Sequence, residues 1–357
     1  MKTLATLVFF IASFALVNAQ ALSGPESVTW DQATNRYFVS NNGANQILVR
    51  STSGVYTIFT STITSGPHGL EIVGNTLYAC DGAYIKGFDL TTAAQVFSVN
   101  TGGSFLNGLC TDGTNNLFSS DFTAKKIFRI NITQQTFTTF VTGLVKSPNG
   151  IYYDQSGGRL IWVTWGTNAP IMQALLSDST VSQVTATTLG NCDGLVRDGL
   201  GNYYVSAWNS SSIVRFTNSF ASPTAVVTGL NSPADIYYNL VTDTLASPNS
   251  GSNTVTFHYF GVTGTQETSF IPSSVSVYPV PVKQKAFVEF QLTNGAVVSI
   301  SVLDITGKEV LRANEKYFNA GKNKCAIETS ALPAGIYLVE LSSSAFRLTK
   351  KIVVAAE

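Results

Sequence analysis

A short phrase recurs six times between residues 25 and 236, and it constrains the fold more than any other feature of the chain. Each copy places a polar residue, and often a glycine, just before an aliphatic residue. The copies lie at residues 25–28, 67–70, 106–109, 148–151, 192–195 and 233–236. Their closing aliphatic residues are 42, 39, 42, 44 and 41 residues apart. A period of about 40 residues with several short strands per unit is typical of a β-propeller, in which each repeat forms one blade.

The rest of each repeat agrees with this interpretation. Runs of strand-forming residues alternate with turns rich in Gly, Asn and Asp, and no segment has the periodicity of an amphipathic helix. Apolar residues make up 44% of the chain and charged residues only 12%. We therefore predict an all-β chain in which residues 20–262 form a six-bladed β-propeller with four strands per blade. The Asp that follows the first strand of several units, such as Asp112, is expected to cap a turn.

The N-terminus has the pattern of a secretory signal peptide. Lys2 precedes an apolar run at residues 4–17, and a small-x-small cleavage site ends at Ala19. We predict a signal peptide at residues 1–19, with cleavage after Ala21 as the second choice and a retained anchor helix as the alternative. The apolar run is short for a bilayer span, and no other stretch is long and apolar enough to be a transmembrane span.

The charge and the cysteine content bear on nucleic-acid binding, on zinc binding and on disulfide formation. The chain has 21 basic and 21 acidic residues and no basic stripe, which argues against nucleic-acid binding. Its four cysteines have the spacing of neither a zinc site nor a disulfide framework. They are Cys80, Cys110, Cys192 and Cys325. Buried free thiols are favoured, and a disulfide between Cys80 and Cys110 stays open.

The second residue of each phrase is expected to face the central channel, where the innermost strands of all blades begin. In chain order these residues are Glu26, His68, Asn107, Asn149, Asp193 and Ala234. Oxygen ligands suit a hard divalent cation, with calcium the best fit and magnesium or manganese next. A cation can polarise a carbonyl and lower the pKa of bound water, and Asp193 or Glu26 could then accept a proton. The ring thus favours lactone or ester hydrolysis, although such residues are also common in turns.

Further candidates lie beside the same channel mouth. His68 could be an acid, a base or a substrate contact, or a hydrogen-bonded structural residue. Trp165 could stack on a sugar or aromatic ligand, or pack in the rim. Asp81 and Asp121 are also expected on the rim. The chain has no nucleophile elbow, P-loop or dinucleotide fingerprint.

Several phrases of the repeat resemble the senescence-marker-protein/gluconolactonase family of six-bladed propellers. They lie at residues 24–31, 106–108, 147–151 and 192–195. In that family a Glu from blade one, an Asn from a Pro-Asn-Gly phrase and an Asp from an Asp-Gly phrase bind a divalent cation, and a further Asn contacts substrate or a metal-bound water. The resemblance covers roughly residues 23–260. It implies that the corresponding ligands are Glu26, Asn149, Asp193 and Asn107.

One departure from the family pattern concerns the substrate. The family's sugar lactonases carry an Arg two residues before the intermediate Asn, where this chain has Phe105, which argues against an aldonolactone. The blades also resemble NHL-repeat and strictosidine-synthase-like propellers, many of which are not hydrolases. The first hypothesis is a secreted divalent-metal-dependent hydrolase of lactones or esters. The alternative is a non-catalytic cell-surface propeller that binds protein or glycan, and a purely structural protein ranks last.

Residues 275–357 show a different pattern, after a Gly/Thr/Ser-rich linker at 263–274. About seven short strand segments separated by turn signals predict a small β-sandwich. Its phrases at 277–282, 303–310, 329–339 and 349–354 resemble the C-terminal sorting domain of type IX secretion substrates. The resemblance implies export across the outer membrane by the type IX secretion machinery, removal of the domain, and release or surface attachment. An ordinary immunoglobulin-like accessory domain is the alternative.

Overall fold

The computed structural model describes residues 19–260, 275–292, 296–304, 308–319, 321–343 and 347–355. The chain divides into two compact units, Met1–His258 and Tyr259–Glu357, and each is described here by itself. The predicted linker lies outside the described residues, as does the predicted signal peptide except for Ala19. Within the described ranges, no helix is long and apolar enough to cross a membrane.

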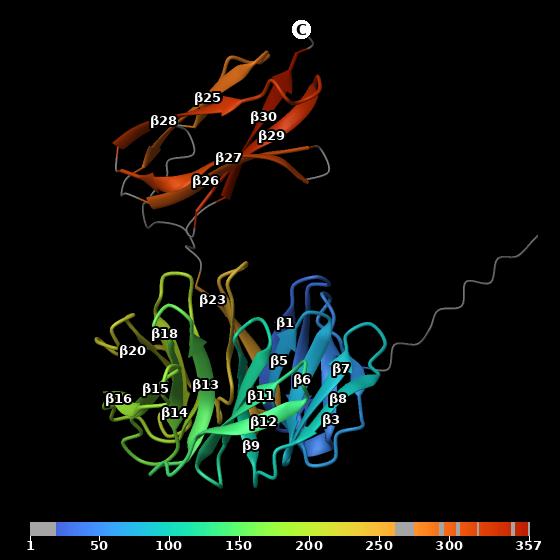
Figure 1. Cartoon of the computed structure of the whole chain (residues 1–357), viewed down its shortest axis with the longest axis vertical. Helices are drawn as coiled ribbons and strands as arrows, with labels where there is room; N and C mark the ends of the chain where they lie inside the picture. Colours follow the sequence, from blue (N-terminus) through green and yellow to red (C-terminus); the bar gives the residue numbers. More distant parts are fainter. Residues whose placement is uncertain are drawn as a thin grey trace, which may run out of the picture. The chain divides into compact units, whose positions relative to one another are not determined.

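The first unit consists of antiparallel sheets, each of which corresponds to one sequence repeat (Figure 1). Blades one to three comprise β1 (Pro25–Asp31), β2 (Arg36–Asn41), β3 (Gln46–Arg50), β4 (Tyr56–Thr60); β5 (Pro67–Val73), β6 (Thr76–Asp81), β7 (Tyr84–Asp89), β8 (Gln95–Asn100); β9 (Leu106–Thr111), β10 (Asn116–Asp121), β11 (Lys126–Asn131) and β12 (Thr136–Val141). Blades four to six comprise β13 (Pro148–Asp154), β14 (Arg159–Thr164), β15 (Ile171–Leu175), β16 (Val181–Thr185); β17 (Cys192–Arg197), β18 (Tyr203–Ala207), β19 (Ser212–Phe216), β20 (Thr224–Thr228); β21 (Tyr237–Asn239), β22 (Thr244–Asn249) and β23 (Thr254–Tyr259). Two single-turn 3₁₀ segments follow β2 and β22, at Asn42–Ala44 and Ser250–Ser252.

The innermost strands of the six blades close into a ring. Each contacts the innermost strand of the next blade, in the order β1, β5, β9, β13, β17, β21 and back to β1. The ring closes where Ser27 forms a parallel bridge with Asp235, whose N–H donates to the Glu26 carbonyl at 2.8 Å. The predicted six-bladed propeller is thus confirmed. Blade six differs from the predicted four strands, because its described part has three and residues 261–274 beyond it are not described.

The glycine of the repeated phrase lets neighbouring blades approach closely at the channel. A Cβ atom on Gly150 would lie 2.3 Å from the carbonyl oxygen of Asp193 in the next blade. A Cβ atom on Gly69 would lie 2.5 Å from the carbonyl oxygen of Asn107. Both obstacles are backbone atoms, so no rotamer change relieves the clash. The glycines of the repeat are therefore required by packing between blades.

Serine hydroxyl groups on the second strands link neighbouring blades through hydrogen bonds. The ladder of blade five shifts register at its phrase, which leaves a phrase N–H outside the ladder. The Ser206 hydroxyl accepts this N–H, from Gly194, at 2.7 Å and donates to the Ala234 carbonyl of blade six at 2.7 Å. Ser120 links blades three and four in the same way, and Ser40 donates from blade one to blade two. These bonds satisfy buried backbone groups that a bulge would otherwise orphan.

Several acidic side chains accept hydrogen bonds from turns and loops, and two of them do not lie where the sequence predicted. Asp112 accepts the N–H groups of three residues in its turn, which confirms the predicted capping role. Asp81 and Asp121 are buried, whereas the sequence predicted them on the rim. Asp121 accepts the N–H of Ser104 at 2.7 Å, and Asp81 accepts that of Ser65 at 2.7 Å. Each carboxylate therefore binds backbone N–H groups of the loop that precedes a phrase.

The four cysteines are all buried and unpaired. The favoured prediction of free thiols is therefore confirmed, and Cys80 is not joined to Cys110. Burial raises the pKa of the Cys80 thiol to about 12, because an apolar environment disfavours the thiolate. This thiol is protonated and unreactive at neutral pH.

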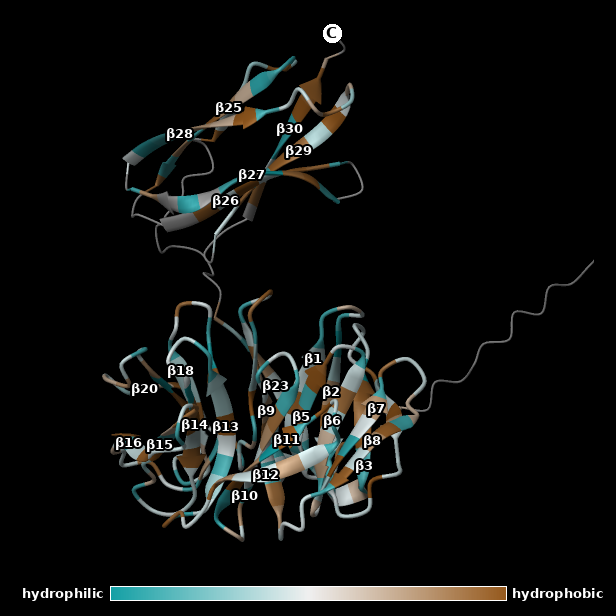
Figure 2. Cartoon of the chain, viewed as in Figure 1, coloured by the Kyte–Doolittle hydropathy of each residue, from teal (hydrophilic) through white to brown (hydrophobic). Residues whose placement is uncertain are grey.

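The second unit is the predicted β-sandwich. One sheet has the strand order β24-β25-β28 and the other β27-β26-β29-β30. The strands are β24 (Ser276–Tyr278), β25 (Lys285–Leu292), β26 (Ala296–Leu303), β27 (Glu309–Phe318), β28 (Gly321–Glu328), β29 (Gly335–Ser342) and β30 (Arg347–Val354). Figure 2 shows apolar and polar residues interspersed along the strands of both units, as expected for sheets with one buried face.

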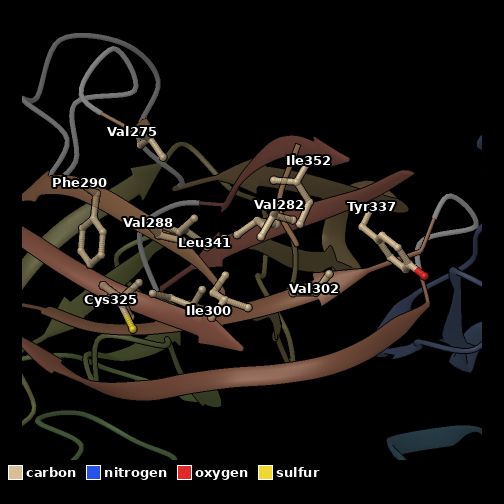
Figure 3. Packing of buried hydrophobic residues seen from close by; sticks show 14 of the residues in the cluster. Val275, Val282, Val288, Phe290, Ile300, Val302, Cys325, Tyr337, Leu341 and Ile352 are labelled. Carbon is tan, nitrogen blue, oxygen red and sulfur yellow. The ribbon is translucent and has the colours of Figure 1, made fainter. Parts of the chain in front are cut away.

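Alternating residues of the two sheets form the core of the sandwich. Every second residue of β25 is buried, including Val288 and Phe290. Figure 3 shows these side chains with Ile300 of β26 and Leu341 of β29, all in one apolar cluster. The Tyr337 hydroxyl donates to the Pro333 carbonyl at 2.9 Å and so satisfies its polar end. The unit therefore has a core of its own.

Substitution of the phrase glycine tests the packing at the channel. We expect Gly150→Ala to lower the free energy of unfolding by about 2 kcal/mol and the Tm by about 4–8 °C, because its Cβ must displace backbone of the next blade. Thermal unfolding in EDTA measures this effect without ligand contributions. The matched control is Gly199→Ala, since a Cβ there meets nothing within 4 Å. Equal stability of the two variants would contradict the packing explanation.

Candidate active site

The structure places two of the predicted ligands side by side in consecutive blades. Asn149 stands at the start of β13, and its amide Nδ2 donates to the Cys192 carbonyl of blade five at 3.2 Å. Asp193, the next residue after Cys192, stands at the start of β17. The two side chains are 1% and 4% exposed. Asn149 Oδ1 and Asp193 Oδ1 are both buried and accept no hydrogen bond from the described residues.

Three carboxyl groups interact across this part of the channel. Burial raises the pKa of Asp193 well above its usual range, and the charges of Glu26 and Asp235 raise it further. Burial also raises the pKa of Glu26 to about 7, although the Ser250 hydroxyl, which donates to it at 3.4 Å, acts in the opposite direction. Glu26 and Asp193 from blades one and five therefore lie close enough to repel each other when both are ionised.

Asp235 is the carboxylate that sequence reasoning missed. It stands at the third position of the sixth phrase, where most other copies have glycine, and it is half-buried. Its Oδ2 accepts the Ser27 hydroxyl at 2.9 Å, and burial raises its pKa to about 7. In blade six, Ala234 replaces the polar residue at the second position. The signal was present one residue later, in the only acidic third position of the ring.

The donor set fits a hard cation. Among the described ion pairs, none includes Glu26, Asp193 or Asp235, so these buried or half-buried carboxyl groups have no protein cation beside them. Within the same described ranges, no group of three or more His, Cys, Asp and Glu side chains is arranged to hold a metal. The candidate set is different in kind, because it combines carboxylates with amides. Two orphaned oxygens beside unneutralised carboxylates have the chemistry that Ca²⁺ requires.

His68 is held by both of its ring nitrogens. Nδ1 lies 3.1 Å from the Gly66 carbonyl and donates to it, and Nε2 lies 3.1 Å from the amide nitrogen of Asn42 and accepts from it. Burial lowers its pKa to about 4, so the ring is neutral at pH 7. This arrangement corresponds to the structural role that the sequence left open, and neither nitrogen is available for proton transfer.

Blade three carries Asn107, which was predicted as a ligand or substrate contact, and Phe105 two residues before it. Asn107 is half-buried at the second position of its phrase, at the start of β9. Phe105 is half-buried just before that strand, and its N–H donates to Asp121 at 3.2 Å. Its ring packs edge-on against His68 of blade two and against Phe122 of its own blade. These two residues place one amide and one apolar surface on blade three, whose innermost strand contacts that of blade four, which carries Asn149.

Aromatic side chains continue from Phe105 around the mouth of the channel. We call the following five residues the aromatic arc: His68, Phe105, Phe122, Trp165 and Trp208. Their successive ring centroids lie 4.6, 5.7, 5.8 and 5.2 Å apart, all in edge-to-face contact. Sequence reasoning identified Trp165 but missed Phe122 and Trp208. The available signal was that all three follow the second strand of their blades, at one repeated position.

The sequence comparisons match the C-terminal part of the chain to a known domain family. Residues 276–355 match the family model described as the secretion system C-terminal sorting domain. No curated protein matches the chain in sequence.

Solved structures similar to this chain are propellers. A gluconolactonase from Xanthomonas campestris has a TM-score of 0.56 and 13% identity, with 65% of this chain and 84% of that chain covered. A calcium-binding protein, regucalcin, from Agrobacterium tumefaciens has a TM-score of 0.54 and 13% identity, with 65% and 83% covered. Virginiamycin B lyase from Staphylococcus aureus has a TM-score of 0.50 and 11% identity, with 77% and 95% covered. At these identities the likeness establishes the fold.

The family match and the fold of the second unit agree. The seven described strands of the sandwich lie within or at the edges of residues 276–355. A domain of this kind directs export through the type IX secretion system, which confirms the predicted secreted or cell-surface location. The C-terminal unit of this chain is thus a secretion system C-terminal sorting domain.

Proposed function

We propose that the propeller is a divalent-metal-dependent hydrolase of lactones or esters that works outside the cell. The observation that carries the proposal is the pair of buried, unpartnered oxygens of Asn149 and Asp193 on adjacent blades. Glu26 adds a second carboxylate whose charge acts on Asp193. These three residues would hold the cation, preferably calcium. Asn107, on the next blade of the ring, would complete the ligand set or contact the substrate.

A bound cation would supply a Lewis acid that polarises the carbonyl of the substrate. The protein's own contribution is proton transfer and orientation. Asp193 or Glu26 accepts a proton from the attacking water, whose oxygen bonds to the carbonyl carbon. The bond from that carbon to the ring or ester oxygen breaks, and the proton passes to this oxygen to give a carboxylic acid and an alcohol. Ser250 orients Glu26 through its hydrogen bond.

The structural neighbours support this choice of reaction. Two of them are described as a gluconolactonase and as a calcium-binding protein. The same scaffold is therefore compatible with lactone chemistry and with calcium. The proposal for this chain depends on its own channel residues, because the shared fold does not by itself fix a function.

Calcium should stabilise the protein through Asp193. We expect saturating Ca²⁺, at about 100 times its Kd, to raise the free energy of unfolding by about 2.7 kcal/mol and the Tm by about 5–10 °C. Asp193→Asn should abolish this rise, because it removes one of the two charged ligands while preserving volume. The control Asp178→Asn makes the same chemical change in an exposed turn and should keep the full rise. The measurement is thermal unfolding in EDTA and in calcium.

Hydrolysis of a panel of lactones and esters completes this test. Wild-type protein should be active with calcium and inactive in EDTA. A calcium-induced rise in Tm without hydrolysis of any member would contradict the hydrolase and leave a metal-stabilised binding propeller. An unchanged rise in Asp193→Asn would contradict the assigned ligands.

Glu71 is a further half-buried carboxyl group, which the proposed site does not use. It stands on β5, and its Oε1 accepts the N–H of Ile72 at 3.1 Å. Burial raises its pKa to about 8, and the charge of Asp235 contributes in the same direction. The neighbouring titratable groups Tyr237 and Cys110 are themselves affected by the Glu71 charge. Glu71 is therefore protonated in the folded protein at neutral pH.

Glu71 should make stability depend on pH. Its pKa is higher in the folded state than in the unfolded state, so its contribution is fully present below about pH 4.5 and is lost as the pH rises through about 8. We expect the Tm of wild-type protein in EDTA to fall from pH 5 to pH 8 by several degrees more than that of Glu71→Gln, a neutral isostere. Parallel Tm profiles of the two proteins would show that Glu71 titrates normally.

A further inference from the structure

The aromatic arc covers only one half of the channel mouth. The residue after the second strand is aromatic in blades three, four and five, where it is Phe122, Trp165 and Trp208. At the same position blades six, one and two carry Ser250, Asn42 and Gly82. The mouth is thus apolar along one side and polar or open along the other.

The arc is held rigidly. The N–H of Phe122 donates to the Phe105 carbonyl at 2.9 Å, and those of Trp165 and Trp208 donate to the corresponding loop carbonyls at 3.0 and 3.1 Å. Edge-to-face contacts then fix the rings against one another. Phe105, Phe122 and the two tryptophans are only half-buried. A preorganised, partly exposed aromatic surface loses little entropy when a ligand binds to it.

Trp208 connects the arc to the candidate ligands. Its buried indole Nε1–H interacts with the Asp193 carboxyl group and acts to lower the pKa of that group. Trp165 packs against Trp208 at 5.2 Å between ring centroids. A ligand that reaches Asp193 therefore lies next to the tryptophan end of the arc.

The chemistry of the arc discriminates between substrates. Phe105 and Phe122 offer no hydrogen-bond partner, and the two tryptophans offer one donor each. A polyhydroxylated sugar lactone can stack only a small C–H face on these rings, and its hydroxyl groups find few hydrogen-bond partners along them. An aromatic ring finds edge and face contacts along the same surface. The half of the mouth near blades three to five therefore favours an aromatic group over a polyhydroxylated one.

We propose that this mouth takes lactones or esters that carry an aromatic or flat apolar group. The group lies on the aromatic arc, and the reacting carbonyl points toward Glu26, Asn149 and Asp193. This inference rests on the proposed hydrolase function for the reaction, but not for the binding of the aromatic group.

Two lactones and two tryptophan variants test the proposal with the full chain in calcium. We expect kcat/KM for dihydrocoumarin, an aryl lactone, to exceed that for glucono-1,5-lactone at least about tenfold. Trp165→Leu should lower kcat/KM for dihydrocoumarin about tenfold, mostly through KM, and leave glucono-1,5-lactone unchanged. Trp30→Leu is the control, because Trp30 lies near the end of β1 opposite the phrase and should affect neither substrate. A preference for glucono-1,5-lactone, or equal loss on both lactones in Trp165→Leu, would overturn the proposal.

Binding of a non-hydrolysable probe separates this proposal from the hydrolase. Chroman has the bicyclic shape of dihydrocoumarin but no ester bond. Saturation-transfer NMR should show it bound to wild-type protein and to Trp30→Leu, and at least about tenfold more weakly to Trp165→Leu. This result without hydrolysis of either lactone would support the aromatic site and refute the hydrolase. Absence of chroman binding to wild-type protein would refute the aromatic site even if a lactone is hydrolysed.

Discussion

The close approach of the six innermost strands around the channel is the constraint on which the propeller depends. Backbone of one blade lies where a Cβ on Gly150 would be, so the phrase must carry a small residue at this point. The same approach bends the phrase out of its own ladder, and Ser206 and Ser120 then satisfy the freed N–H groups while bonding to the next blade. The residue before the glycine is left facing the channel. Packing, hydrogen bonding and the position of the candidate ligands thus have one geometric cause.

This geometry has an electrostatic consequence. Glu26, Asp193 and Asp235 come from three blades and share a confined space, and burial together with mutual repulsion raises the pKa of each of the first two. Desolvated carboxylates require protons or a cation to remain stable. The orphaned amide oxygen of Asn149 favours the cation, because a proton on a carboxyl group would leave this acceptor unsatisfied. The argument for calcium therefore depends on an amide as much as on the acids.

The sequence predicts the ring of innermost strands better than it predicts the loops around the channel. The ring follows from local sequence, because the repeat period fixes the blades and the phrase fixes which residue enters the channel. Asp235 escaped prediction because it is shifted by one residue, and only the closure of β21 on β1 brings it to Glu26. Asp81 was predicted on the rim but is buried. The sequence does not show that a carboxylate at a strand end accepts hydrogen bonds from the N–H groups of the preceding loop. Phe122 and Trp208 were missed because their contacts join different blades.

The location of the protein bears on how such a site would work. The sorting domain places the propeller outside the cell, and extracellular modules typically bind calcium with Kd values of about 10⁻⁴–10⁻³ M. A site with two carboxylates and two amides has few charges for calcium and falls naturally in this weaker range. Its carboxyl groups would then exchange protons for calcium as the surroundings supply the ion. Phe105, Phe122 and Trp165 of the aromatic arc do not titrate, so the apolar surface that they present is the same with or without metal. Charge at the ring and shape at the arc can therefore act independently on one ligand.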